Sequence, residues 1–232
     1  MREATGPTTV DILAAVDAFR SDLGGSDNGT ASGSQAAGRR EVDWEVPDAD
    51  AAPLFLASDF YNTSSTRGLV VTGPRGLELQ ASADASNPTN TTAELGHVNN
   101  TYPTAFAPFS GARLVAPVDG NVVELGFFVP GTGTPAVVQG VGVVVTDVDV
   151  AAASKLAFYD PFGRLLVDRA FLTTPGIASH SFLGVTTQDA VIARVVITLG
   201  NAALGPDDVT QGGAADIVVL DNVIYDEPQA VP

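Results

Sequence analysis

Along most of the chain, apolar and polar residues alternate with a period of two, the pattern of strands that bury one face. In EVDWEV (41–46), the side chains of Val42, Trp44 and Val46 share the apolar face. GLVVTGPRGLELQ (68–80) predicts two short strands around a Gly-Pro-Arg-Gly turn. Similar runs predict further strands at 113–118, 122–129, 137–150, 155–159, 164–172, 189–199 and 216–228.

The pattern differs near the N-terminus, where the apolar spacing is that of a helix. Ile12, Val16, Phe19 and Leu23 recur every three or four residues, and Gly24-Gly25 ends the run. Asp11 follows Thr8 by three residues, close to a capping box. The Gly- and Ser-rich stretch SDNGTASGSQAAGRR then predicts a flexible linker or loop.

Together these elements predict an all-β protein. About ten strands without crossover helices exclude a parallel α/β sheet and favour an antiparallel two-sheet β-sandwich, jelly-roll-like in its packing. The predicted domain organisation is an N-terminal helix and flexible linker over 1–37, a β-sandwich domain over 38–228 and a short tail over 229–232. The 232 residues are enough for one such domain to fold without staples.

The charge of the chain narrows the range of partners. The chain has twenty-seven acidic and eleven basic residues, a net charge of -16, so nucleic acid and anionic membranes are poor partners for it. The chain has no cysteine, which excludes disulfides and thiolate metal sites. An acidic surface suits divalent cations, high salt or simple solubility.

The last predicted strand, in DIVVLDNVIYDEP, carries a carboxylate among apolar residues. Strict alternation places Asp221 on one face with Val219 and Val223, and Asn222 on the other. A buried carboxylate needs partners, so Asp221 is expected either to bind calcium or to accept hydrogen bonds from an arginine or loop amides.

This strand also carries a resemblance. LDNVIY is similar to the closing strand of jelly-roll carbohydrate-binding modules, in which an Asp on that strand and an acidic residue of the first strand hold a structural calcium. The resemblance implies Asp221 and Glu45 as ligands here, with Asp43 as the alternative to Glu45.

The longer sequence resembles a family of bacterial exported β-sandwich proteins, many of which carry a PEP-CTERM sorting tail. The matching segments span most of residues 38–228, among them GRREVDWEVPD, FYNTSSTRGLVV and GVGVVVTDVDVAAASKLAFYDPFGRLL. No biochemical activity is attached to that family, and the chain given stops at EPQAVP without the sorting tail. The resemblance therefore implies fold and export.

A second pair of carboxylates lies in TDVDV. Asp147 and Asp149 are two residues apart, so they share one face of an extended segment and can converge on one ion. The alternative is a solvated strand end. Asp207 and Asp208, adjacent in the loop 205–216, leave the same two interpretations open.

Enzymatic motifs are scarce. The chain has two histidines, His97 and His180, both in stretches that resemble loops. The G-x-S-x-G elbow, H-E-x-x-H and the phosphate-binding glycine loops are missing. A glycan-active enzyme built on two carboxylates stays open as an alternative, because composition cannot nominate a pair.

A sugar-binding surface needs exposed aromatic rings, because the faces of sugars stack on them. Trp44 is expected in the core. Tyr61, Tyr102 and Phe106, in polar loop-like stretches, are the candidate ligand-binding residues; the alternative is that they anchor loops from inside.

The sequence therefore predicts a non-catalytic, calcium-stabilised binding module, secreted or at the cell surface, that contacts a glycan or matrix. The alternative is a structural subunit that self-associates through the N-terminal helix or edge strands. MREATGPTTVDILAAV lacks the layout of a signal peptide, so the signal was removed, lies upstream, or does not exist. No stretch approaches the length of a membrane span.

Overall fold

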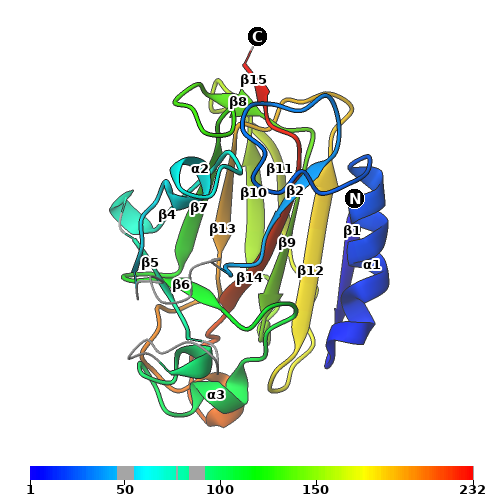
Figure 1. Ribbon diagram of the computed structural model, residues 1–232. Coiled ribbons are helices and arrows are strands. Elements are labelled where there is room, and N and C mark those ends of the chain that lie inside the picture. The colour runs from blue at the N-terminus through cyan, green and yellow to red at the C-terminus, as the bar shows by residue number, and fades with distance from the viewer. Residues whose placement is uncertain (46–54, 77, 84–91, 232) are drawn as a thin grey trace.

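Two antiparallel β-sheets pack face to face in the computed structural model (Figure 1), which describes residues 1–45, 55–76, 78–83 and 92–231. The larger sheet has eight strands in the order β1-β12-β9-β14-β6-β5-β3, and β2 also pairs with β14. Its strands are β1 (Arg2–Gly6), β2 (Arg39–Val42), β3 (Phe55–Leu56), β5 (Leu79–Ala81), β6 (Val115–Pro117), β9 (Gly140–Thr146), β12 (His180–Thr186) and β14 (Val219–Asp226). The predicted antiparallel sandwich is confirmed.

The second sheet has five strands in the order β11-β10-β13-β7-β4, and a two-stranded sheet lies at one end. These strands are β4 (Leu69–Thr72), β7 (Val122–Phe127), β10 (Lys155–Tyr159), β11 (Leu165–Ala170) and β13 (Arg194–Thr198), with the small pair β8 (Ala136–Val137) and β15 (Gln229–Ala230). The helices are α1 (Thr9–Asp22), α2 (Phe60–Thr63) and α3 (Tyr102–Ala105), with 3₁₀ turns η2 (Pro74–Gly76), η3 (Ala93–Leu95) and η4 (Val209–Gln211).

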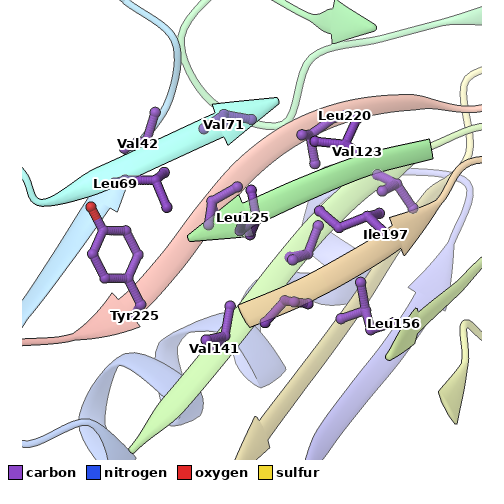
Figure 2. Packing of buried hydrophobic residues seen from close by; sticks show 14 of the residues in the cluster. Val42, Leu69, Val71, Val123, Leu125, Val141, Leu156, Ile197, Leu220 and Tyr225 are labelled. Carbon is purple, nitrogen blue, oxygen red and sulfur yellow. The ribbon is translucent and has the colours of Figure 1, made fainter. Parts of the chain in front are cut away.

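The main core lies between the two sheets and consists largely of branched aliphatic side chains (Figure 2). Val141 and Leu220 of the larger sheet face Val123, Leu156 and Ile197 of the smaller one, and all five are fully buried. Along each strand every second side chain points between the sheets, and these are the apolar positions of the alternating pattern.

Helix α1 packs on the outer face of the larger sheet, against β12 and the strands beside it (Figure 1). Ile12, Val16 and Phe19 are fully buried, as the helical spacing predicts. Two glycines make room for the Phe19 ring: a Cβ added at either Gly142 or Gly184 would lie 2.6 Å from it. The helix is therefore part of the sandwich, and its apolar face is not free for self-association.

The stretch 26–40 differs from the flexible linker that its composition predicts. It wraps around a fully buried ion pair, in which Arg40 Nε and Nη2 donate to the two carboxylate oxygens of Glu227 at 2.8 and 2.7 Å. Glu227 also accepts hydrogen bonds from Asn28 Nδ2 (2.8 Å) and from the Gln35 backbone (3.0 Å). Because a buried charge needs such partners, this pair fixes a segment whose side chains form little core.

Strand β14 contains a β-bulge at its centre, where Asp221 and Asn222 together lie opposite a single residue of β9. The bulge shifts the alternation by one residue. Leu220 faces the core between the sheets, and beyond the bulge Val223 and Tyr225 do so. The face assignment predicted by strict alternation is therefore wrong from Asp221 onward.

Strand boundaries agree with the sequence where polar turns lie on both sides, as at 155–159, which is β10. The strand predicted over 41–46 ends earlier, because β2 stops at Val42 and Trp44 has a φ of 64°. Trp44 is nevertheless buried as predicted, and Val46 lies outside the described residues.

None of the helices in the described part of the chain is long and apolar enough to cross a membrane.

Candidate functional site

Three aspartates from two distant segments converge at the end of the sandwich where β9 finishes. Asp147 and Asp149 follow β9, and Asp208 precedes η4. One carboxylate oxygen from each lies within 4.8 Å of the other two. Asp147 and Asp208 are fully buried and Asp149 partly so. The structure thus places Asp147 and Asp149 together, and their role as metal ligands stays a prediction.

Backbone amides hold several oxygens of this group in place. Asp149 Oδ1 accepts a hydrogen bond from the Gly176 N–H at 2.8 Å, and the Asp149 N–H donates to Asp216 Oδ1 at 2.9 Å. Asp208 Oδ1 accepts from the Ile217 N–H at 2.8 Å. Each of these bonds fixes one side of a carboxylate and thereby orients the other oxygen.

Four other oxygens of these aspartates have no such partner, whereas Asp208 Oδ2 accepts hydrogen bonds from the Thr210 N–H at 2.9 Å and from the Thr210 hydroxyl at 2.6 Å. Both oxygens of Asp147, Oδ2 of Asp149 and Oδ2 of Asp216 are buried without a hydrogen bond. The Ala178 N–H nearby donates to a backbone carbonyl instead, at 2.7 Å. Burial, and then the carboxylates of Asp208, Asp149 and Asp216, raise the pKa of Asp147 to about 9. Burial raises the pKa of Asp216 to about 6.

The loops that carry these aspartates are tightly constrained. Asp147 has a φ of 73°, in the left-handed region that non-glycine residues seldom adopt. A Cβ added at Gly200 would lie 2.0 Å from the Asp216 carbonyl oxygen, and one at Gly213 would lie 1.8 Å from the Asp207 carbonyl oxygen. These positions require glycine, because the two backbones approach too closely for a side chain.

Asp221 occupies a different environment, in the bulge of β14. Its Oδ2 accepts a hydrogen bond from the Phe109 N–H, and its backbone carbonyl accepts one from the Trp44 indole. The other carboxylate oxygen has no hydrogen-bond partner. Burial raises the pKa of Asp221 well above its usual range. Loop amides are thus among its partners, as one of the two interpretations expected, and a metal at Asp221 stays a prediction.

Glu45 contacts the same loop at another point. Its Oε1 accepts the Ala112 N–H at 2.7 Å, and its Oε2 lies 3.9 Å from Arg113 Nε. Within the described ranges, neither Glu45 nor Asp221 belongs to the group of Asp147, Asp149 and Asp208.

The three candidate ligand-binding aromatics are buried, as the alternative interpretation of loop anchors expected. Tyr61 packs edge-on against Trp44, with ring centroids 5.5 Å apart. Tyr102 packs against Phe106 with ring centroids 4.9 Å apart and ring planes tilted by 44°, and its hydroxyl donates to the Pro206 carbonyl at 3.0 Å. Tyr61 belongs to the main core between the sheets, and Tyr102 and Phe106 pack in a second cluster with Ile217 and Val219, so the rings anchor their segments from inside.

Neither histidine belongs to the group of aspartates, although His180 pairs with Thr146, the neighbour of Asp147. His180 is the first residue of β12 and is buried, contrary to the expected loop, and neither ring nitrogen has a hydrogen-bond partner. Burial lowers the pKa of both His97 and His180. The candidate metal-binding group found among the described residues contains carboxylates only.

An exposed aromatic ring lies at the opposite end of the sandwich, on the turn between β10 and β11 (Figure 1). Phe162 is 94% exposed at the tip of this turn. The ring borders a hollow of about 330 Å³. The hollow is lined by Val137, Asp160, Pro161, Phe162, Arg164, Leu166, Ala190, Val191 and Val231.

Comparison with known proteins gives distant structural likenesses only. No protein-family model and no curated protein matches the chain. The chain is similar to the enzymatically active domain of bacteriophage CBA120 tailspike protein 4, at 12% identity and a TM-score of 0.30, over 78% of this chain and 22% of that one. It is also similar to TmCBM61, solved in complex with β-1,4-galactotriose, at 14% identity and a TM-score of 0.29, over 76% of this chain and 95% of that one. Neither likeness is close enough to bear on the function of this chain.

Proposed function

We propose that this protein is a non-catalytic binding module that contacts an uncharged glycan outside the cell, with Phe162 as the ring on which a sugar stacks. The exposed Phe162 ring beside a hollow carries this proposal. The location outside the cell rests on the resemblance to exported β-sandwich proteins.

The turn that presents Phe162 is held rigidly from below. Asp160 Oδ1 accepts hydrogen bonds from the Phe162 and Arg164 amides, both at 2.9 Å. Gly163 completes the turn with a φ of 77°. A turn whose backbone is held in one conformation loses little backbone freedom on binding, and this favours affinity.

The hollow beside the ring combines apolar and polar groups in the way that ligand sites do. Pro161, Leu166 and Val231 line an apolar floor, and the Arg164 side chain, 78% exposed, can donate hydrogen bonds to hydroxyl groups. The volume of about 330 Å³ is enough for one or two sugar rings.

The charge of the molecule selects among glycans. A net charge of -16 repels sulfated and carboxylated polysaccharides, so we propose a neutral glycan, either free or in an extracellular matrix. The non-catalytic character is supported by the burial of the converging carboxylates, because a substrate cannot reach Asp147 or Asp208.

Affinity electrophoresis in gels that contain neutral polysaccharides tests the proposal. The wild-type protein should be retarded by at least one of them, and Phe162→Ala should lose most of the retardation. A pair of aromatic rings contributes about 0.5–1.5 kcal/mol beyond the area that it buries, and a stacked sugar of similar strength would change the affinity by roughly two- to tenfold.

Phe55→Ala is the matched control, because Phe55 is 42% exposed and borders a different hollow. It should bind like the wild type. If Phe55→Ala loses the retardation and Phe162→Ala keeps it, the glycan binds near Phe55 and the proposed site is wrong. If no neutral polysaccharide retards the wild-type protein, the proposal of glycan binding is wrong.

A further inference from the structure

The geometry points to a calcium site: we propose that Asp147, Asp149 and Asp208 bind one Ca²⁺ ion, with Asp216 beside them. This proposal is independent of the glycan surface, which lies at the other end of the sandwich.

The spacing of the carboxylates fits a single ion. Calcium binds oxygen at about 2.3–2.6 Å, so two of its ligands lie at most about 5 Å apart. One oxygen each from Asp147, Asp149 and Asp208 lies within 4.8 Å of the other two. One cation can therefore contact all three.

The group is incomplete as a hydrogen-bonded cluster. Asp147 is fully buried, and neither of its oxygens accepts a hydrogen bond. Asp149 Oδ2 and Asp216 Oδ2 are likewise buried and unpartnered, while their Oδ1 atoms accept backbone N–H groups. Buried carboxylates without partners are strongly unfavourable, and several together repel one another, so the arrangement calls for a positive charge among them.

No basic side chain supplies that charge within the described ranges. The ion pairs found there join arginines and the single lysine to other acids, such as Arg40 to Glu227 and Lys155 to Asp168. None of the four aspartates near the end of β9 takes part in one of these ion pairs. A bound cation is the remaining source of positive charge.

The ligand set favours calcium over other metals. All the candidate ligands are oxygens, and zinc prefers histidine and cysteine. Magnesium demands a near-ideal octahedron and keeps several waters, whereas calcium accepts irregular cages of carboxylates. The strained backbone of Asp147, with a φ of 73°, fits a site in which a bound ion compensates for local strain.

Calorimetric titration with CaCl₂ and thermal unfolding, both on EDTA-treated and dialysed full-length protein, test the proposal. We expect one Ca²⁺ per chain and a rise of several degrees in melting temperature at a hundred times the dissociation constant. Magnesium should bind at least tenfold more weakly. No heat of binding at millimolar calcium would overturn the site, and tighter binding of magnesium would overturn the choice of metal.

The variants separate a metal ligand from a structural residue. Asp147→Asn should lose the calcium-dependent rise, yet in EDTA it should melt no lower than the wild type, because a neutral amide of the same size replaces a buried carboxyl group that accepts no hydrogen bond. A purely structural Asp147 would instead make the variant less stable in both conditions. If Asp147→Asn does not fold, Asp149→Asn, whose free oxygen points into the same group, should lose the rise as well.

Asp189→Asn removes the same charge from an exposed position and is the matched control. It should keep the full calcium-dependent rise. The proposal is overturned if Asp147→Asn, or Asp149→Asn where only that variant folds, keeps the full calcium-dependent rise in melting temperature. It is also overturned if Asp189→Asn loses that rise.

Discussion

At the scale of single residues, Asp221 shows why a carboxylate stands in the middle of an apolar strand. Strands β2 and β6 pair with successive parts of β14, β6 at Leu220 and β2 from Val223 onward. The bulge lies between them. The loop that carries Phe109 fills this gap and donates its amide to Asp221, while Asn222 donates from Nδ2 to Ser110 Oγ at 2.7 Å. The two polar residues thus replace the ladder partners that β14 lacks at this point.

We therefore expect Asp221→Ala to be destabilised by about 1–3 kcal/mol, because the buried Phe109 amide loses its acceptor. Asp221→Asn keeps an acceptor and removes a buried charge, so it should be the milder change. Urea unfolding of the two variants measures the difference. Equal stability of Asp221→Ala and the wild type would remove this role from Asp221.

The same variant also separates two places for a cation. With calcium bound by the group around Asp147, Asp221→Ala keeps the full calcium-dependent rise in melting temperature. If the rise disappears in Asp221→Ala and persists in Asp147→Asn, calcium binds at Asp221, as the resemblance to carbohydrate-binding modules implies.

At the scale of elements, the docking of α1 depends on two glycines in neighbouring strands. Gly142 and Gly184 are paired across β9 and β12, and the Phe19 ring lies on both. Glycine weakens a strand in general, since it packs no side chain. Here the missing side chains form the surface that receives the helix.

Gly184→Ala should therefore destabilise the protein by about 1–3 kcal/mol, the usual effect of overpacking, because the new Cβ would lie 2.6 Å from the Phe19 ring. The double variant Phe19→Leu/Gly184→Ala should recover part of this loss, with a coupling above about 0.5 kcal/mol in a double-mutant cycle. Additive effects would show that α1 does not rest on Gly184.

Gly133→Ala is the control for this series, since a Cβ there meets nothing within 4 Å. It should leave the free energy of unfolding nearly unchanged. A loss comparable to that of Gly184→Ala would point to an effect of glycine replacement itself and not to the contact with Phe19.

At the scale of the whole molecule, the sequence predicts the architecture better than the sites. Strands with one buried face alternate visibly, so β7 and β10 follow from the pattern. Strand β12 was not predicted, because nearly all its residues are buried and Gly184 interrupts it. Asp147 and Asp208 are far apart in the sequence, so no local pattern predicts that their carboxylates lie close together in the fold. The run Asp160-Pro161-Phe162-Gly163 between two predicted strands is typical of a turn, but local sequence cannot show that the Phe162 ring is exposed.

The net charge of -16 leads to a prediction for the whole molecule. Like charges on a compact surface repel one another and destabilise the folded state. Salt shortens the range of that repulsion from about 10 Å at 0.1 M to about 3 Å at 1 M. Raising NaCl over this range, with EDTA present, should therefore raise the melting temperature by a few degrees, as measured by scanning calorimetry.

Tetramethylammonium chloride at the same ionic strength is the control, because it screens charge equally and its bulky cation cannot enter a buried cage. It should give the same rise as NaCl. Ion pairs between distant segments, such as Arg169 to Glu3 at 3.0 Å, act in the opposite direction, since salt weakens them. A melting temperature that falls with both salts would mean that these pairs outweigh the repulsion. A small addition of CaCl₂ has little ionic strength, so a rise on adding it reports binding and not screening.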